Sequence, residues 1–488
     1  MEKTGLNWRF VIRILGFTLC FESVFLFLTA GVSAYYRQWD LPYFLLSGAV
    51  TLCCGVLLAL LGIKERKQWI GKREGCLAVT LTWIMFGIFG LLPFYLSGAI
   101  PSLTDAFFET ISGVTTTGST VLTNIDGLPK GLLFWRCIMQ WIGGMGMIVF
   151  SLAVLPLLGG GAAQLFDAEI TGITHDRFRP RISQVAKRLW GIYVSFTVVE
   201  ALLLYFGPMN AFDAVCHAFT TMGTGGSSTK QAGIGYWNSP YVEYVVAIFM
   251  ILAACNYSLY YYLFRGNYKK FVRDEELRWF LSVVGVVTVI VFAGLWVSHR
   301  TGDTGEAFRH SFFQVASYIS CTGFAVNDFV SWGPFFWFIF ILLMLHCGCA
   351  GSTSGGIKAV RILIFKKIGV NEFRKQIHPR AIVPLRLNNR VLSTDVVQRV
   401  QAFVALYVAI LFFSCLFLSL CGMGFEESIG AAVSSMANVG HGLGEIGPSG
   451  SFAAIPAVCK WYLAFLMVVG RLEIFTVIML FTPGFWRK

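Results

Sequence analysis

The pattern that organises this chain first occurs as Asp105-Ala-Phe-Phe-Glu-Thr-Ile-Ser-Gly-Val-Thr-Thr-Thr-Gly118. An acidic residue opens a short amphipathic stretch, a run rich in glycine, serine and threonine follows, and a long apolar segment comes next. The same order recurs in Asp213-Ala-Val-Cys-His-Ala-Phe-Thr-Thr-Met-Gly-Thr-Gly-Gly226, His310-Ser-Phe-Phe-Gln-Val-Ala-Ser-Tyr-Ile-Ser-Cys-Thr-Gly323 and Glu427-Ser-Ile-Gly-Ala-Ala-Val-Ser-Ser-Met-Ala-Asn-Val-Gly440. The final glycine sets the register without gaps. The third copy is the least regular, because its acids, Asp303 and Glu306, lie upstream.

A single run of glycine, serine and threonine most often forms a surface turn. Four copies, each placed between apolar segments, instead indicate an internal repeat. Each amphipathic stretch holds about three helical turns, which is too short to cross a bilayer. We therefore expect four re-entrant helices, each followed by irregular backbone at membrane depth. Such backbone survives there only where protein buries it or where it lines water, so we expect the four breaks to gather around one axis.

The composition is that of a membrane protein. Hydrophobic residues make up 56% of the 488 positions and charged residues 13%, which a soluble core cannot absorb. Most of the apolar segments are near or above the length that crosses a hydrocarbon layer of roughly 30 Å as a helix. We expect ten spans, at Phe10–Tyr36, Leu41–Ile63, Gly75–Gly98, Leu132–Leu158, Leu189–Phe206, Tyr241–Phe264, Phe280–Val297, Phe335–Cys347, Val400–Cys421 and Trp461–Phe481. The first lacks a cleavage site after it and is expected to be retained.

The net charge of +12 orients the chain and does not indicate nucleic-acid binding. Basic residues gather in alternate connections, at Lys3, Arg9 and Arg13, and in Lys64–Arg73, Arg177–Arg188, Arg265–Arg273, Lys366–Arg390 and Arg487–Lys488. The connections between these hold few basic residues. This alternation is the positive-inside pattern, and it places both termini in the cytoplasm.

Irregular backbone that faces water can bind a dehydrated cation, because carbonyl oxygens replace its hydration shell. Glycine supports such backbone since it adopts positive φ without steric cost. Each short helix also points its negative C-terminal end at the axis, which favours a cation. The candidate cation ligands are Thr116, Thr117, Gly118, Thr224, Gly225, Gly226, Cys321, Thr322, Gly323, Asn438, Val439 and Gly440. The opening acids Asp105, Asp213 and Glu427 fit a helix N-terminus, with ion ligation as the alternative.

A second glycine-rich stretch follows the eighth apolar segment. A helix cannot continue smoothly through it, since each glycine costs about 1 kcal/mol relative to alanine. We expect a loop at membrane depth beneath the four breaks, and a simple helix kink is the alternative. The residues concerned are Gly348, Gly351, Ser352, Thr353, Ser354, Gly355, Gly356 and Lys358. Lys358 is either a charge in the pathway or the first cytoplasmic anchor.

Arg471 lies within the last apolar segment, where an arginine near the bilayer centre costs roughly 2.5–3.5 kcal/mol. Glu473 is two positions further on and faces away from it. We therefore expect Arg471 to point into a wet pore and to meet an acid on the side of the glycine-rich loop. A structural ion pair with another span is the alternative.

Other chemistry finds less support in the sequence. The 13 cysteines mostly lie in apolar segments and are expected to be small buried hydrophobes. Cys347-Gly-Cys349 beside His346 offers only three candidate metal ligands. The seven histidines are scattered and no acid pair with a base stands out, so we do not expect an enzyme. Glu22 and Glu200 could join a proton path or bond to neighbouring hydroxyl and aromatic groups, and the sequence leaves both open.

At these residues the sequence resembles the TrkH/TrkG/KtrB potassium-uptake superfamily, and most closely its TrkH-type members. The resemblance covers nearly the whole chain. It rests on Thr-Thr-Thr-Gly118, Gly225-Gly226, Cys-Thr-Gly323-Phe, Ala-Asn-Val-Gly440, Trp141-Ile-Gly-Gly-Met-Gly146, Gly348-Cys-Ala-Gly-Ser-Thr-Ser-Gly-Gly-Ile-Lys358, Gly470-Arg-Leu-Glu473 and Pro483-Gly-Phe-Trp486. KtrB-type proteins resemble only the part from about Gly75 onward, so the two leading spans favour the TrkH type.

The resemblance implies potassium uptake across a bacterial plasma membrane by a homodimer, with no cofactor bound by this chain. It implies four span–pore helix–span repeats around a pseudo-fourfold pore, preceded by two spans. The glycine-rich loop would be an intramembrane gate and Arg471 a barrier in the pore. A separate nucleotide-binding ring of the TrkA kind would control opening, with Gly159–Arg188 and Lys366–Thr394 as candidate docking surfaces. A sodium-permeable or proton-coupled transporter of the same fold stays the alternative.

Some positions depart from the family pattern. Ser227 stands where Phe is usual, His441 stands where Pro is common, and Cys321 replaces a hydroxyl residue. Gly118 occupies the place where related plant proteins that prefer sodium can carry Ser, which favours potassium. We expect two N-terminal spans in residues 1–74 and the first repeat in 75–158. The second repeat with its preceding connection is expected in 159–272, the third with the loop in 273–366, and the fourth with its connection in 367–488.

Overall fold

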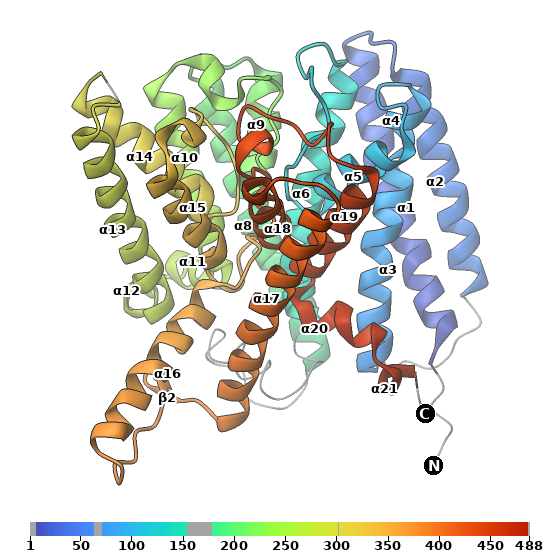
Figure 1. Cartoon of the computed structure of the whole chain (residues 1–488). Coiled ribbons are helices and arrows are strands. Elements are labelled where there is room, and N and C mark those ends of the chain that lie inside the picture. Colours follow the sequence, from blue (N-terminus) through green and yellow to red (C-terminus); the bar gives the residue numbers. More distant parts are fainter. Residues whose placement is uncertain (1–5, 63–70, 154–177, 301, 487–488) are drawn as a thin grey trace, which may run out of the picture.

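The computed structural model describes residues 6–62, 71–153, 178–300 and 302–486. This part of the chain is almost entirely helical, and within it the only strands form one two-stranded hairpin. Long helices stand side by side as an upright bundle (Figure 1). The expected all-α membrane architecture is therefore confirmed.

Two helices precede the first repeat, α1 (Trp8–Tyr35) and α2 (Leu41–Leu61). They pack closely because a glycine lies at their contact: a Cβ added at Gly16 would lie 2.3 Å from the backbone nitrogen of Ala59. Small residues at helix contacts allow this approach in membranes. Asp40 ties the pair to the first repeat by accepting a hydrogen bond from the backbone N–H of Leu132 at 2.9 Å.

The four repeats follow in chain order. The first contains α3 (Lys72–Gly90), α4 (Leu92–Leu96), α5 (Leu103–Val114) and α6 (Lys130–Ala153). The second contains α8 (Phe178–Tyr205), α9 (Ala211–Met222), η2 (Gly233–Trp237), α10 (Pro240–Ala254) and α11 (Tyr257–Phe264). A short connecting helix, α12 (Tyr268–Arg273), leads to the third repeat.

The third repeat contains α13 (Glu275–Val297), α14 (Thr304–Ile319), η3 (Phe329–Trp332) and α15 (Pro334–His346). The glycine-rich stretch then leads into α16 (Ala359–Ile377), and the hairpin of β1 (Arg386–Leu387) and β2 (Arg390–Val391) lies in the fourth repeat. This repeat continues with α17 (Thr394–Leu420), α18 (Phe425–Ala437), η4 (Gly444–Ile446), α19 (Ala457–Arg471), α20 (Glu473–Ile478), η5 (Met479–Phe481) and α21 (Pro483–Trp486).

Three of the ten expected spans differ from a continuous crossing helix. Six helices of the described chain are long and apolar enough to span by themselves. The expected span Tyr241–Phe264 is bent by 98° between α10 and α11, and Trp461–Phe481 is bent by 110° between α19 and α20. The short α15 has only 13 residues before the glycine-rich stretch. Hydropathy averaged over a window does not reveal such breaks, because each bent pair of helices is apolar enough as a whole to pass for one span.

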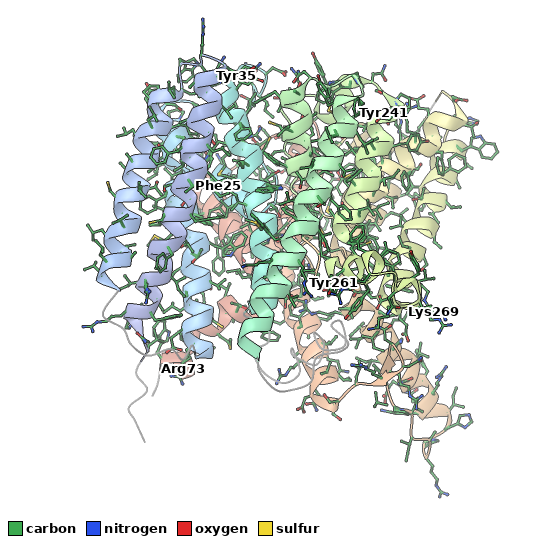
Figure 2. The ribbon with its side chains drawn as sticks, turned by 180° about the vertical axis from the view of Figure 1, so that it is seen from behind. Phe25, Tyr35, Arg73, Tyr241, Tyr261 and Lys269 are labelled. Carbon is green, nitrogen blue, oxygen red and sulfur yellow. The ribbon has the colours of Figure 1, made fainter. Side chains whose placement is uncertain are left out.

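Both ends of the described chain lie on one side of the bundle. The rings of Trp8 and Trp486 stack with centroids 6.3 Å apart. Arg73 and Lys269 lie at the lower end in Figure 2, whereas Tyr35 and Tyr241 lie at the upper end. The two ends of the described chain therefore lie together on one side of the bundle.

Candidate functional site

The four short helices α5, α9, α14 and α18 begin with side-chain caps, and Asp105, Asp213 and Glu427 lie in the first turns, as the sequence predicts. The side chains of Ser102, Asn210 and Asp303 accept hydrogen bonds from backbone N–H groups of the first turn. Glu427 accepts from the backbone N–H of Gly424 at 2.8 Å. These partners satisfy donors that a helix start leaves free.

The acids that open these helices are engaged in structural contacts. Asp105 forms an ion pair with Lys460 at 2.6 Å. Asp213 accepts from the hydroxyl of Thr229 at 2.6 Å. These contacts match the predicted role at a helix N-terminus rather than ion ligation.

The backbone after each short helix follows one path in all four copies. Two positions before the final glycine, φ is positive at Thr116 (55°), Thr224 (54°), Cys321 (62°) and Asn438 (56°). The final glycines also have positive φ, at Gly118 (84°), Gly226 (71°), Gly323 (78°) and Gly440 (104°). Residues with a Cβ seldom adopt such values. The register predicted from the final glycine therefore holds in the backbone.

The final glycines form a closed ring of contacts, each with the next repeat. A Cβ added at Gly118 would lie 2.0 Å from the carbonyl oxygen of Gly225, and one at Gly226 would lie 2.0 Å from that of Thr322. A Cβ at Gly323 would lie 1.8 Å from the carbonyl oxygen of Val439, and one at Gly440 would lie 2.5 Å from that of Thr117. No side chain fits at these four positions. The ring confirms four repeats around a pseudo-fourfold axis.

Side chains brace this ring differently in each repeat. Hydroxyl pairs support the first and third loops, with Thr115 and Thr117 at 2.8 Å and Ser320 and Thr322 at 2.7 Å. Asn438 of the fourth loop donates to the hydroxyl of Thr117 at 2.9 Å and joins it to the first. The hydroxyl groups of Thr117, Ser320 and Thr322 thus hold the loops, whereas the buried hydroxyl of Thr116 has no hydrogen-bond partner among the residues that the structure describes.

Gln140 on α6 was not anticipated from the sequence. Its Nε2 donates to the carbonyl oxygen of Gly225 at 2.9 Å, and its Oε1 accepts from the backbone N–H of Ser227 at 3.1 Å. The carbonyl of Gly225 is therefore already hydrogen bonded, as is that of Gly440, which accepts from the hydroxyl of Ser119 at 2.9 Å. The position of Gln140 inside an apolar run is the sequence signal for this contact, because a buried amide needs hydrogen-bond partners.

A buried ion pair behind the first loop was also missed. Glu109 on α5 and Arg136 on α6 meet at 2.9 Å, with 4% and 3% of their side chains exposed. Glu109 accepts from the backbone N–H of Val121 at 3.0 Å, and Arg136 donates to the carbonyl oxygen of Ser228 at 3.3 Å. The pair thus links the segments that follow the first and second loops. A charge in each of two apolar stretches was the sequence signal.

The glycine-rich stretch between α15 and α16, residues 347–358, is a loop and not a kink. The backbone N–H of Cys349 donates to the carbonyl oxygen of Ala254 at 2.8 Å, beside the break between α10 and α11. The hydroxyl of Thr353 donates to the carbonyl oxygen of Met222, the last residue of α9, at 3.1 Å. A Cβ at Gly355 would lie 2.4 Å from the carbonyl oxygen of Ala437. This loop therefore lies against the C-terminal ends of α9 and α18.

Arg471 ends α19, at the break before α20, and does not lie in the middle of a continuous helix. Its side chain is 1% exposed. It donates to the carbonyl oxygen of Thr353 in the loop at 2.6 Å and to that of Gly143 on α6 at 3.1 Å. The expected acidic partner is replaced by carbonyl oxygens. Glu473 instead pairs with Arg361 at 2.5 Å.

Lys358 is buried at the end of the loop and donates to the carbonyl oxygen of Ser354. This burial excludes its role as an exposed cytoplasmic anchor. His346 uses one ring nitrogen to accept from the indole of Trp279 at 3.0 Å, and the other contacts the carbonyl oxygen of Cys347 at 2.9 Å. The predicted docking surface 159–188 lies largely outside the described residues.

The comparisons with known proteins place these features in a family. The family model described as "TrkH: Cation transport protein" matches residues 41–488. The chain is 38% identical to "Trk system potassium uptake protein TrkH" of Escherichia coli K12, over 99% of this chain and 100% of that protein. It is 36% identical to the protein of the same name from Halomonas elongata, over 99% and 100%.

A solved structure agrees over the whole length. The "Crystal Structure of the Potassium Transporter TrkH from Vibrio parahaemolyticus" matches with a TM-score of 0.90 and 34% identity, and 100% of each chain is covered. The family model, the sequence identity and the fold thus all match TrkH proteins. The chain belongs to the TrkH family of cation transport proteins.

Proposed function

We propose that this chain takes up potassium across the plasma membrane through the ring formed by its four loops. The closed ring of glycine contacts carries the proposal. It brings together backbone of one conformation from four distant parts of the chain, at the ends of four helices whose negative poles favour a cation. The relatives at 36–38% identity are named as potassium uptake proteins, which supports the choice of ion.

The filter of this proposal consists of three residues from each repeat. Its backbone carbonyls would replace the water shell of the ion as it passes. The members are Thr116, Thr117, Gly118, Thr224, Gly225, Gly226, Cys321, Thr322, Gly323, Asn438, Val439 and Gly440. The carbonyl of Gly225 already accepts from Gln140, so the four loops are chemically unequal. We therefore propose moderate selectivity for potassium over sodium.

The loop 347–358 closes the pathway beneath the filter in this proposal. Its contacts with the ends of α9 and α18 support a position of this glycine-rich backbone beneath the ring. Arg471 holds the loop through the carbonyl oxygen of Thr353 and adds a positive charge below the filter. A cation there raises the barrier for potassium, so the loop and the arginine act in the same direction.

The assembly and its control are also part of the proposal. The family resemblance supports a homodimer in the bacterial inner membrane, with both termini in the cytoplasm. It also supports a nucleotide-binding ring of the TrkA kind as the partner that opens the loop. Residues 159–188 and 366–394 are the proposed docking surfaces, and the repeat boundaries 75–158, 159–272, 273–366 and 367–488 belong to the same proposal.

Ion flux in liposomes that contain the purified chain tests this function. Gradients of potassium and sodium, applied in turn, should give faster potassium flux, and Gly118→Ser should lower that preference. Equal flux of the two ions would favour a sodium-permeable transporter of the same fold. A pH gradient varied at fixed voltage separates proton coupling, for which the buried Glu22 and Glu200 are the candidate groups, from flux that follows voltage alone.

A further inference from the structure

The carboxylate of Glu276 lies against both ends of the glycine-rich loop. Glu276 is in the first turn of α13, and 4% of it is exposed. Its Oε1 accepts from the backbone N–H of Ala350, in the first half of the loop, at 2.7 Å. The same oxygen accepts from the backbone N–H of Val360, in the first turn of α16, at 3.1 Å. One atom therefore bridges the start of the loop and the helix that leaves it.

This contact supplies a cap that α16 lacks in its own sequence. The N-cap position of α16 is Lys358, whose side chain makes no capping hydrogen bond. A carboxylate at a helix N-terminus is favoured both by hydrogen bonding and by the helix dipole. Glu276 provides this carboxylate from another helix. The base of the loop is closed by a second bond, from the backbone N–H of Ala359 to the carbonyl oxygen of Gly348 at 2.9 Å.

The residues just before Glu276 are bound to the hairpin of β1 and β2. Asn388, in the turn of that hairpin, donates to Asp274 at 2.8 Å. Its side-chain oxygen accepts from the backbone N–H of Glu275 at 2.9 Å. Lys367 of α16 pairs with Glu275 and donates to the carbonyl oxygen of Arg386 at 2.7 Å. Figure 1 places α16 and this hairpin at the lower end, beneath the bundle.

We infer that Glu276 is a positioning residue that latches the loop in its closed form and couples it to the hairpin at residues 386–391. This inference rests on the proposed function, in which that loop closes the pathway. A shift of the hairpin would move Asp274 and Glu275, and with them the carboxylate that holds Ala350 and Val360. The loop would then lose bonds at two points at once. Coupling of this kind needs an element with two arrangements, and a loop held at its base provides one.

The side chain at position 276 is tested first, by potassium flux into liposomes that contain the full chain alone. Glu276→Leu leaves the buried backbone N–H of Val360 and the part-buried N–H of Ala350 without their acceptor, and we expect flux to rise about tenfold or more. Glu276→Gln keeps one acceptor oxygen at the same reach, so flux should rise much less. Glu276→Asp is shorter by one methylene and should lie between the two. Asp395→Leu, a change at an exposed acid in the first turn of α17, is the matched control and should leave flux unchanged.

The order of these variants separates a latch from general damage. The ratio of potassium to sodium flux should stay at the unsubstituted value in every one of them, because the ring of glycines is not altered. Equal flux in the unsubstituted chain and in the Leu, Gln and Asp variants would overturn the inference. A fall in selectivity that accompanies the rise in flux would do the same, since it would indicate distortion of the filter. If Glu276→Leu fails to fold, the order of the Gln and Asp variants decides alone.

The coupling to the hairpin is tested at its turn. Asn388 and Asn389 both have positive φ, at 48° and 65°, so glycine suits the backbone at either position. Asn388→Gly removes both bonds to the start of α13 and should raise flux several-fold, whereas Asn389→Gly should leave it unchanged. In the Glu276→Leu background, Asn388→Gly should add less than it does alone. Equal flux in the two asparagine variants would overturn the coupling.

One further variant distinguishes failure of the latch from failure of the gate. Deletion of residues 352–354 shortens the loop without touching Glu276. If this deletion raises flux and Glu276→Leu does not, the loop is a gate but Glu276 is not its latch. If neither change raises flux while the unsubstituted chain conducts potassium, both the proposed gate and the latch are wrong. If the unsubstituted chain and the shortened chain conduct no ion, the proposed transport itself fails.

Discussion

Replacement of Arg471 by methionine should open the pathway in the absence of any partner. Methionine fills a similar length of buried space but donates no hydrogen bond. The change removes the bonds to the carbonyl oxygens of Thr353 and Gly143, at 2.6 and 3.1 Å. Only the bond to Thr353 holds the loop itself, since Gly143 lies on α6. The loop should therefore lose its strongest contact with α19.

The size of the effect follows from the charge of the donor. A hydrogen bond to a charged group contributes about 1.5–3 kcal/mol after exchange with water. Loss of the Thr353 contact should shift the balance of closed and open loop by roughly tenfold to hundredfold. Removal of the positive charge also lowers the barrier for a cation, so the two effects add in the same direction. We expect potassium flux into liposomes that contain the Arg471→Met chain to rise by at least about tenfold.

Arg471→Lys separates the two contributions. Lysine keeps the charge but is a single point donor, so it cannot reach both carbonyl oxygens as the guanidinium does. Flux near that of the unsubstituted chain would assign the effect to charge, and flux near that of Arg471→Met would assign it to the bonds. Arg374→Met, at an exposed position on α16, is the control and should change nothing. Unchanged flux in Arg471→Met would refute the reasoning for both contributions.

Three other changes give separate checks on the site. Gly118→Ala should reduce potassium flux strongly, because its Cβ would lie 2.0 Å from a carbonyl oxygen. Gly98 also has a positive φ, 75° against 84° at Gly118, but nothing lies within 4 Å of an added Cβ, so Gly98→Ala should leave flux intact. Glu109→Gln should lower the thermal unfolding midpoint, since breaking a buried pair costs roughly 3–5 kcal/mol. The double variant Glu109→Met with Arg136→Met should recover part of the lost midpoint. No recovery would show that the unpaired charge of Arg136 does not cause the lower midpoint. Deletion of three residues within Gly348–Gly356 should raise flux without a partner, and unchanged flux would count against the gate.

The sequence predicts those structural features that depend on residues close together in the chain. The four final glycines could be aligned because each closes a stretch of fixed length, and all four have positive φ. The acids at the helix starts were correctly read as helix-start residues, since capping depends on neighbours in the chain. The glycine-rich loop was foreseen from the cost of glycine in a helix.

The features that the sequence does not predict depend on contacts between segments that lie far apart in the chain. Arg471 was expected to meet an acid, yet it meets carbonyl oxygens of Gly143 and Thr353, which lie 328 and 118 positions away. Backbone carbonyls exist at every position, so no residue type marks them as partners. The bends at 98° and 110° were missed for a similar reason, because each bent pair of helices is apolar enough as a whole to pass for one span.

The ring of glycines depends on the same residue type at four equivalent positions, whereas the side chains that support the loops differ from repeat to repeat. The ring requires the same backbone in four places, and only glycine meets that requirement where a Cβ would strike the neighbouring carbonyl. The supporting side chains differ between the loops. A hydroxyl pair supports the first loop and another supports the third, Gln140 supports the second loop, and Asn438 supports the fourth. A substitution at any of the four glycines should therefore damage the whole ring. Substitution of a support should disturb one loop, so it should alter ion preference before it abolishes flux.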